Sequence, residues 1–418
     1  MNPFELNPMP VERTLGDWKA LYPAPDDKRE TGSYSRARVI LMNGTEFENV
    51  WFSHQFSRAT ADNELRRELA LIRRGEQQQQ KLLACLKPAD ESILEHTISY
   101  EQLAVDLTAE LARTETNPNV KRALDFALLE DFDHLYRYAN LLDLEYGLSA
   151  QELTGGYTEI MPGRPTIAEH RHPYDSIRQP STPGDSLLTR LHAGIITAAE
   201  QQTMNFYMNV AGIYPSEEGR RLYQEIGQIE EQHVTQYGSL IDPTATPLEN
   251  LLLHQYTECY LYYSCLQVEA DPALREVWER FFEAECAHVH LAARLLREYE
   301  GIEWQAVLPQ GEFPELLSLH SNIGYVRGVL AEQADWTAHR ETYVPAGKLP
   351  DDSDFARYQA LVNGDVECVP SHRVIERYID RFGTDYRFET RLNPIEALQN
   401  RRRDNTELGR MLVPVGAR

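Results

Sequence analysis

The sequence predicts an all-α protein whose main part is a bundle of three helix hairpins. Three observations support this prediction. Apolar residues recur at spacings of three and four over long stretches of the chain. Capping residues, prolines and glycines stand where such stretches begin and end. Six of the stretches follow one another in pairs joined by short turns, which is typical of antiparallel helix pairs.

Residues 1–91 are expected to form an N-terminal extension. Asn43-Gly44 stands between two apolar runs in residues 38–52, a pattern typical of a tight turn, so a small β-hairpin is expected there. A helix is predicted from Asp62 to Leu86, with Asp62 as its N-cap and Pro88 after its end.

Residues 92–300 contain the three predicted hairpins. Asn117-Pro118 separates the helices of the first hairpin, and Thr246 with Glu249 predicts a capping box at the start of the third. The paired ranges are 92–113 with 120–146, 186–213 with 217–240, and 247–270 with 272–299.

Residues 301–418 are expected to form a C-terminal extension. One further helix is predicted over residues 313–333, and the polar remainder is predicted to be a largely irregular tail wrapped on the surface.

Composition excludes several classes of protein. The 41 basic and 65 acidic residues give a net charge of −24, which argues against a nucleic-acid partner. No apolar run approaches the roughly 18 residues of a membrane span, and the first residues lack the pattern of a signal peptide. The five cysteines are scattered, as expected for reduced thiols. We therefore expect a cytoplasmic protein without a membrane partner.

The hairpins share a motif that suggests metal binding. An acid precedes a histidine by three residues in Asp131-x-x-His134, Glu230-x-x-His233 and Glu285-x-x-His288. Residues at this spacing lie on one face of a helix, and here that face is otherwise apolar. Buried acids are costly unless they are paired or bind metal. A fourth match, at His172, lies in a Gly/Pro-rich loop and is treated as accidental; His170 and His172 are expected to be solvated.

The first helix of each hairpin adds an inward-facing acid of its own: Glu101, Glu200 and Glu258. These acids precede the acid of the motif by 30 residues in the first and second hairpins and by 27 in the third. In an antiparallel hairpin such a separation places the first acid level with the acid–histidine pair.

This pattern resembles the ferritin-like di-iron carboxylate superfamily, in which two helices each supply a Glu and two others each supply Glu-x-x-His. The resemblance covers residues 92–300. It implies two bound iron ions, or manganese with similar ligands, and reaction with O₂. The first hairpin departs from the pattern because Asp131 stands in place of Glu, with Glu130 as the alternative ligand.

Chain geometry predicts which hairpins share the metals. The six residues 241–246 span at most about 20 Å, too little to cross the bundle, whereas the 39 residues 147–185 are ample for a crossover. The first two hairpins are therefore predicted to form the principal site, while the third supplies extra ligands, a second site or a buried polar network. The principal residues are Glu101, Asp131 (or Glu130), His134, Glu200, Glu230 and His233, and the others are Glu258, Glu285 and His288.

The favoured function is a di-iron oxygenase or oxidase acting on an unknown organic substrate, because both extensions could form a lid or a substrate pocket. No dinucleotide or flavin fingerprint is present, so a separate electron-donor protein is expected. Two alternatives remain open at this point. One is a ferroxidase or iron-handling protein, and the other is a metal-free helical interaction protein whose Glu–His pairs are structural.

Overall fold

The computed structural model describes the chain except residues 24–26, 161–178, 333–340, 354–355, 358–359, 362–363, 365–368, 384–407 and 413–418. The predicted all-α class is confirmed, since the described residues are mostly helical. The chain divides into two compact units. The first unit comprises Met1–Asp90, Ser181–Gln202 and Ile241–Leu319, and the second unit comprises Glu91–Pro180, Thr203–Leu240 and His320–Arg418. This division differs from the three ranges expected from the sequence.

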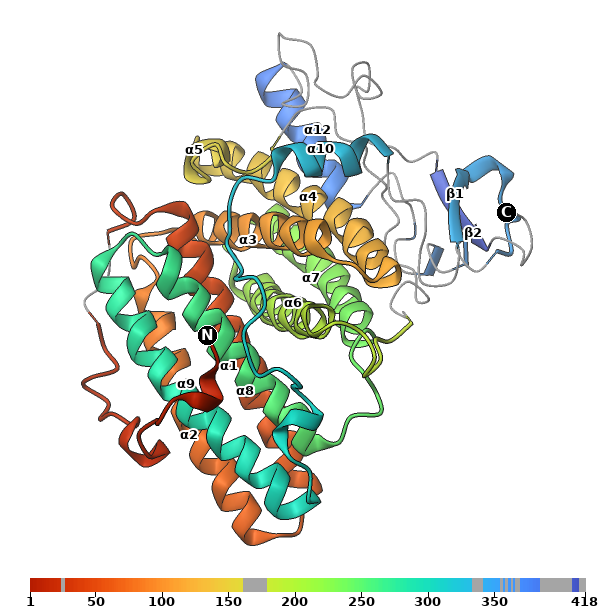
Figure 1. Cartoon of the computed structure of the whole chain (residues 1–418). Coiled ribbons are helices and arrows are strands. Elements are labelled where there is room, and N and C mark those ends of the chain that lie inside the picture. Colours follow the sequence, from red (N-terminus) through yellow and green to blue (C-terminus); the bar gives the residue numbers. More distant parts are fainter. Residues whose placement is uncertain are drawn as a thin grey trace. The chain divides into compact units, whose positions relative to one another are not determined.

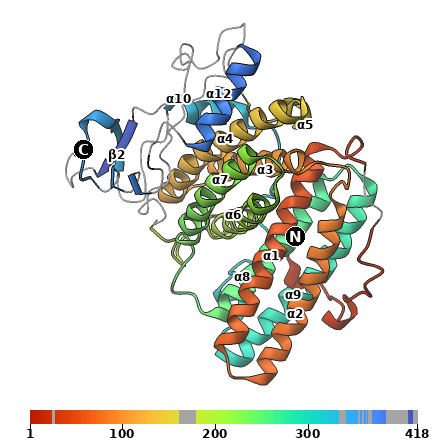
Figure 2. The same cartoon turned by 180° about the vertical axis from the view of Figure 1, so that it is seen from behind.

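The first unit contains two antiparallel helix pairs (Figures 1 and 2). Helix α1 also packs on α8, and α2 packs on α9, so the four helices form a bundle. The Thr246–Glu249 capping box forms at the start of α8, as predicted. The helices are α1 (Ser33–Ala59), α2 (Asn63–Leu86), α8 (Pro247–Val268) and α9 (Pro272–Glu300), with short 3-10 turns η1 (Pro3–Glu5), η2 (Val11–Arg13) and η4 (Trp304–Ala306).

The β-hairpin expected over residues 38–52 is wrong, because these residues lie within α1. Gly44 is a point of close helix approach and not part of a turn. A Cβ atom on Gly44 would lie 3.2 Å from the backbone oxygen of Ala198 and 2.6 Å from the Gln202 amide. Asn43 donates a hydrogen bond of 2.8 Å to Gln202. Packing between helices therefore overrides the local preference of Asn-Gly for turns.

The second unit contains α3 (Ile93–Thr114), α4 (Pro118–Tyr146) and α7 (Glu217–Gly238). The start of each helix is capped by a side chain, from Ser92, Asn117 and Ser216 respectively. Gly147 ends α4 in the left-handed conformation with φ of 65°, as the sequence predicts. Helix α6 (Leu187–Ile213) is continuous, beginning in the first unit and ending in the second. A short helix, α5 (Ala150–Leu153), follows α4.

The C-terminal part of the second unit includes helix α10 (Ile323–Glu332), which is shorter than the predicted helix, and helix α12 (Pro370–Phe382). Helix α12 packs on α4 and α7. The backbone N–H of Ser371 donates to Glu225 at 2.7 Å, and Tyr378 donates to Asp143 at 2.7 Å. Strands β1 (Glu341–Pro345) and β2 (Leu408–Leu412) form an antiparallel ribbon, and η5 (Ala346–Lys348) follows β1. Among the described residues, no helix combines the length and apolar character needed to cross a bilayer.

Candidate metal centre

The acidic and imidazole side chains predicted from the first two hairpins point into the interior. Helices α3, α4 and α7 each begin at a side-chain cap, which helps to fix the face that their residues present to the core. No member of the set is more than 1% exposed: Glu101 on α3, Asp131 and His134 on α4, Glu200 on α6, and Glu230 and His233 on α7.

Two groups of three ligand atoms form among these residues. Glu101, His134 and Glu230 make up the first group, whose ligand atoms all lie within 4.8 Å of one another. Asp131, Glu200 and His233 make up the second by the same criterion. Glu200 stands on the continuous helix α6, just before its residues pass into the second unit. The residues that the sequence assigned to one site are therefore brought together.

The Glu230 carboxylate connects the two histidines. Its Oε1 lies 2.8 Å from Nδ1 of His134, and its Oε2 lies 3.3 Å from Nδ1 of His233. Nδ1 of His233 also lies 3.5 Å from Oδ1 of Asp131. Both imidazoles thus turn the same ring nitrogen toward the shared carboxylate, while the rings lie 5.7 Å apart, centre to centre.

Glu130 and Asp131, which the sequence left as alternatives, have different positions. Asp131 lies among the ligand atoms, whereas Oε2 of Glu130 lies 2.6 Å from Nε2 of His233. A carboxylate on the outer nitrogen of a metal-binding histidine is the usual device for fixing its orientation and tautomer. The geometry therefore favours Asp131 as ligand and Glu130 as the residue that orients His233.

Hydroxyl groups hold two of the other carboxylates. Tyr207 of α6 donates to Oε1 of Glu101 at 2.5 Å, and Thr108 of α3 donates to Oδ2 of Asp131 at 3.0 Å. Burial raises the pKa of Tyr207 well above its ordinary value, so the phenol keeps the proton that it donates.

Burial has a strong effect on the charges of this cluster. It raises the pKa of Asp131 to about 7, against the opposing effect of the His233 imidazole. Burial also acts to raise the pKa of Glu230, but the imidazoles of His134 and His233 outweigh it and the pKa is lowered. Buried acids in one cluster with opposing shifts are typical of functional sites.

Unpaired polar atoms show that this set of side chains fits a metal. Nε2 of His134 is buried and has no hydrogen-bond partner, and Oδ1 of Asp131 and Oε2 of Glu230, also buried without a hydrogen bond, face Nδ1 of His233 at 3.5 and 3.3 Å. Leaving such atoms unpaired is costly in a protein interior. Carboxylate and imidazole groups together suit iron or manganese.

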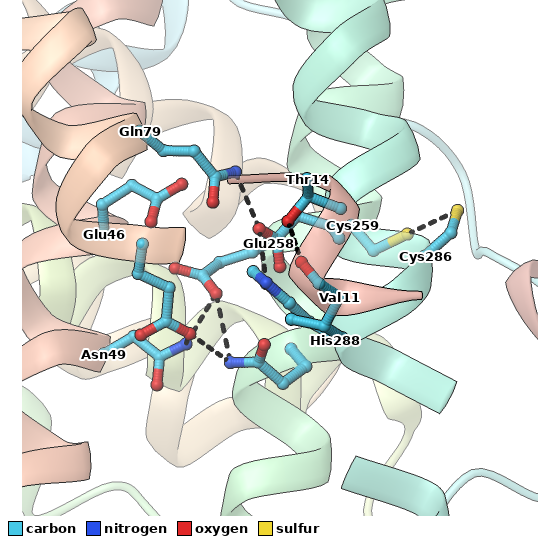
Figure 3. A network of polar contacts seen from close by, with 12 residues as sticks. Val11, Thr14, Glu46, Asn49, Gln79, Glu258, Cys259, Cys286 and His288 are labelled. Carbon is cyan, nitrogen blue, oxygen red and sulfur yellow. Dashed lines mark hydrogen bonds and ion pairs between the residues drawn. The ribbon is translucent and has the colours of Figure 1, made fainter. Parts of the chain in front are cut away.

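The third predicted motif lies in the first unit. Glu258 on α8 and Glu285 and His288 on α9 are buried there with Glu46 of α1 and Glu76 of α2. Figure 3 shows Glu46, Glu258 and His288 of this group. Glu46 and Glu76 were not predicted from the sequence. A signal was present, because Glu46 precedes Glu76 by the same 30 residues found in two hairpins, and Gln79 follows Glu76 at the position of the motif histidine. His170 and His172 lie outside the described residues.

Comparison of the chain with protein-family models, with curated proteins and with solved structures returns no significant match. The interpretation of both clusters therefore rests on their own geometry and chemistry.

Proposed function

We propose that Glu101, Asp131, His134, Glu200, Glu230 and His233 bind two iron ions, with manganese as the alternative, and that the protein is an oxidase or oxygenase acting on an organic substrate. The Glu230 carboxylate supplies the main support. Because it presents a different oxygen to each histidine, Glu230 would hold the metal together with both His134 and His233. In ferritin-like proteins, bridging carboxylates hold the metals close together.

The bound ions would supply the electrons that reduce O₂. The protein's own residues would set the conditions for that chemistry. Glu130 holds the His233 ring in place through Nε2, and Tyr207 restricts the Glu101 carboxylate. Apolar and aromatic side chains such as Leu128 and Tyr138, buried in the core of the second unit, would keep bulk water away from the reacting groups.

An organic substrate is favoured over iron itself for one reason. The chain has far more residues than a ferroxidase bundle needs, and α10 and α12 belong to the second unit that contains most of the ligands. Extra segments of this kind can form a substrate pocket or a lid. Electrons would come from a separate donor protein, because the sequence has no dinucleotide or flavin fingerprint.

The proposal is tested by anaerobic loading of the chelator-treated protein with Fe(II), followed by elemental analysis and O₂-uptake measurements. His134→Ala/His233→Ala is expected to lose about two equivalents of metal and to retain its helical circular dichroism. Wild-type metal content in this double variant would reject the site. Oxygen uptake that stops when the added Fe(II) has become ferric, with no further turnover when an electron donor is supplied, would indicate a ferroxidase.

A further inference from the structure

The first unit contains a buried cluster that repeats the chemistry of the second. Each helix of its bundle contributes an acid, and α9 adds an imidazole. We call the set of Glu46, Glu76, Glu258, Glu285 and His288 the first-unit cluster. All five side chains are at most 2% exposed. Figure 3 shows Glu46, Gln79, Glu258 and His288 converging from different helices.

Hydrogen bonding in the first-unit cluster follows one rule. Every carboxylate has one oxygen held by a neighbouring side chain and one oxygen without any hydrogen-bond partner. The unpartnered atoms are Oε2 of Glu46, Oε2 of Glu76, Oε1 of Glu258 and Oε2 of Glu285. In a metal-free polar network, both oxygens of so deeply buried a carboxylate would be expected to be paired.

The hydrogen-bonded oxygens of Glu46, Glu76 and Glu258 accept from uncharged side chains. Asn49 donates to Glu76 at 2.8 Å and to Glu258 at 2.6 Å, and Gln255 donates to Glu76 at 2.8 Å. Tyr262 donates to Glu46. None of these donors carries a positive charge, so they orient the carboxylates without neutralising them. Metal-binding carboxylates are commonly oriented in this way by hydrogen bonds from residues around the site.

Helix α9 supplies the nitrogen ligand. Nδ1 of His288 lies 3.0 Å from Oε1 of Glu285, and Gln79 donates to the same oxygen at 2.8 Å. The His288 ring fits against α2 because residue 75 is glycine, where a Cβ atom would lie 2.8 Å from Nε2 of His288. The oxygen of the Gln79 amide has no hydrogen-bond partner and is a further candidate ligand.

We propose that the first-unit cluster is a second divalent-metal centre, bound by Glu46, Glu76, Glu258, Glu285 and His288 with Gln79 in the place of a second histidine. This centre is separate from the one proposed for the second unit and does not depend on it. Its donors are mostly carboxylate oxygens with one imidazole, a combination that suits manganese or iron(II) better than zinc or copper.

The ligand atoms of the first-unit cluster lie farther apart than those of the two groups described above, since no three of its residues have ligand atoms that all lie within 4.8 Å of one another. Small rotations of the glutamates on binding would bring the unpartnered oxygens closer to the ion. Burial, together with the charges of the neighbouring carboxylates, raises the pKa of Glu46 and of Glu258.

Two cavities of the first unit adjoin the cluster. One, of about 280 Å³, is lined by Gly75 and Gln79 of α2, by Ala284 of α9 and by residues of the N-terminal segment. The other, of about 30 Å³, is lined by Asn49 and Glu258. Both cavities are therefore lined by side chains that belong to the cluster or hold it, namely Gln79, Asn49 and Glu258.

The test uses the full-length protein, freed of metal by chelation and titrated with MnCl₂ under argon, with unbound Mn(II) measured by electron paramagnetic resonance. The second-unit variant His134→Ala/His233→Ala serves as background. It is expected to retain at least one tightly bound Mn(II). Adding Glu258→Gln to this background should weaken that binding at least 10-fold, and adding Glu279→Gln, an exposed position of the same unit, should leave it unchanged.

Two results would overturn the proposal: a background variant that binds no Mn(II), or equal binding with and without Glu258→Gln. Circular dichroism checks that each protein is folded. If Glu258→Gln does not fold, Gln79→His in the same background decides the question, since it completes Glu-x-x-His on α2 and should tighten Mn(II) binding at least 5-fold. Unchanged affinity in that variant would count against the centre. Loss of the second-unit metal alone would leave this result unaffected, so the two proposals fail separately.

Discussion

Nε2 of His233 lies 2.6 Å from Oε2 of Glu130, while Nδ1 of the same ring faces Glu230 and Asp131 at 3.3 and 3.5 Å. The two nitrogens of one imidazole are thus divided between an orienting acid and the candidate ligands. Adjacent residues of α4, Glu130 and Asp131, therefore serve the same histidine in different ways.

Glu130→Gln is expected to lower the metal affinity of the second unit by about 10- to 100-fold, because residues that orient a ligand commonly contribute this much. The amide keeps the shape of the side chain, but its oxygen accepts a weaker hydrogen bond from the imidazole N–H than a carboxylate does. Isothermal titration with Mn(II), in a Glu258→Gln background, measures the change. Glu231→Gln, an exposed neighbour on α7, is the matched control and should bind as the background does. An equal loss in both variants would contradict the orienting role.

Glu269 should make the first unit sensitive to acid. It pairs with Arg38 at 3.0 Å and accepts hydrogen bonds from Ser35 and Trp278. Burial acts to raise its pKa, but the hydrogen bond and charge of Arg38 outweigh it, so the pKa is lowered. A lowered pKa stabilises the fold above the ordinary pKa of about 4.3, and this stabilisation is lost as pH falls through the folded-state value.

Accordingly, Glu269→Gln should lower the free energy of unfolding by roughly 3 kcal/mol at pH 7, since it leaves Arg38 without its buried partner. The difference in the free energy of unfolding between this variant and the wild-type protein should shrink steadily below about pH 4. Urea unfolding with a chelator present, followed by circular dichroism at several pH values, measures it. A difference that does not change between pH 7 and pH 3 would show that the ion pair is not the cause.

Gly44→Ala should destabilise the protein by about 1–3 kcal/mol, even though alanine favours helix. The added Cβ would press on the Ala198 backbone oxygen, which cannot rotate away as a side chain could. Gly212→Ala on α6 is the control, because nothing lies within 4 Å of a Cβ atom there and a small gain is expected. Thermal unfolding compares the two. Equal or higher melting temperatures for Gly44→Ala would refute the close approach.

Cys259 and Cys286 should resist alkylation in the folded protein. Their sulfur atoms lie 3.6 Å apart, both side chains are buried, and burial raises the pKa of the Cys259 thiol well above its ordinary value. Thiolate is the reactive form, so both burial and the raised pKa slow the reaction. Peptide mass analysis after brief iodoacetamide treatment should find Cys85 labelled well before either residue. Labelling of Cys259 at the rate of Cys85 would contradict the packing.

Sequence analysis succeeds where local chemistry decides the structure. Asp62 accepts a hydrogen bond from the backbone N–H of Leu65 at the start of α2, and Thr246 and Glu249 form the capping box at the start of α8. Such signals lie within one turn of the helix that they begin, so the ends of helices can be predicted within a few residues.

Local structure and ligand identity could not be predicted from the sequence where contacts with residues distant in the chain determine them. Asn43-Gly44 favours a turn locally, but its contacts with α6 keep it in a helix. That error also concealed Glu46, which has no helical motif to mark it once its segment is taken as a strand. The choice between Glu130 and Asp131 likewise needs the position of His233 on another helix.

The division of the chain has a consequence for protein synthesis. Helices α1 and α2 leave the ribosome long before α8 and α9, the helices on which they pack. At about 5–20 residues per second, the nascent α1–α2 hairpin would wait roughly 10–40 s for its partners. During that time the faces that carry Glu46 and Glu76 would be exposed to solvent, where chaperones, and the ions that these acids attract, could reach them before the bundle closes.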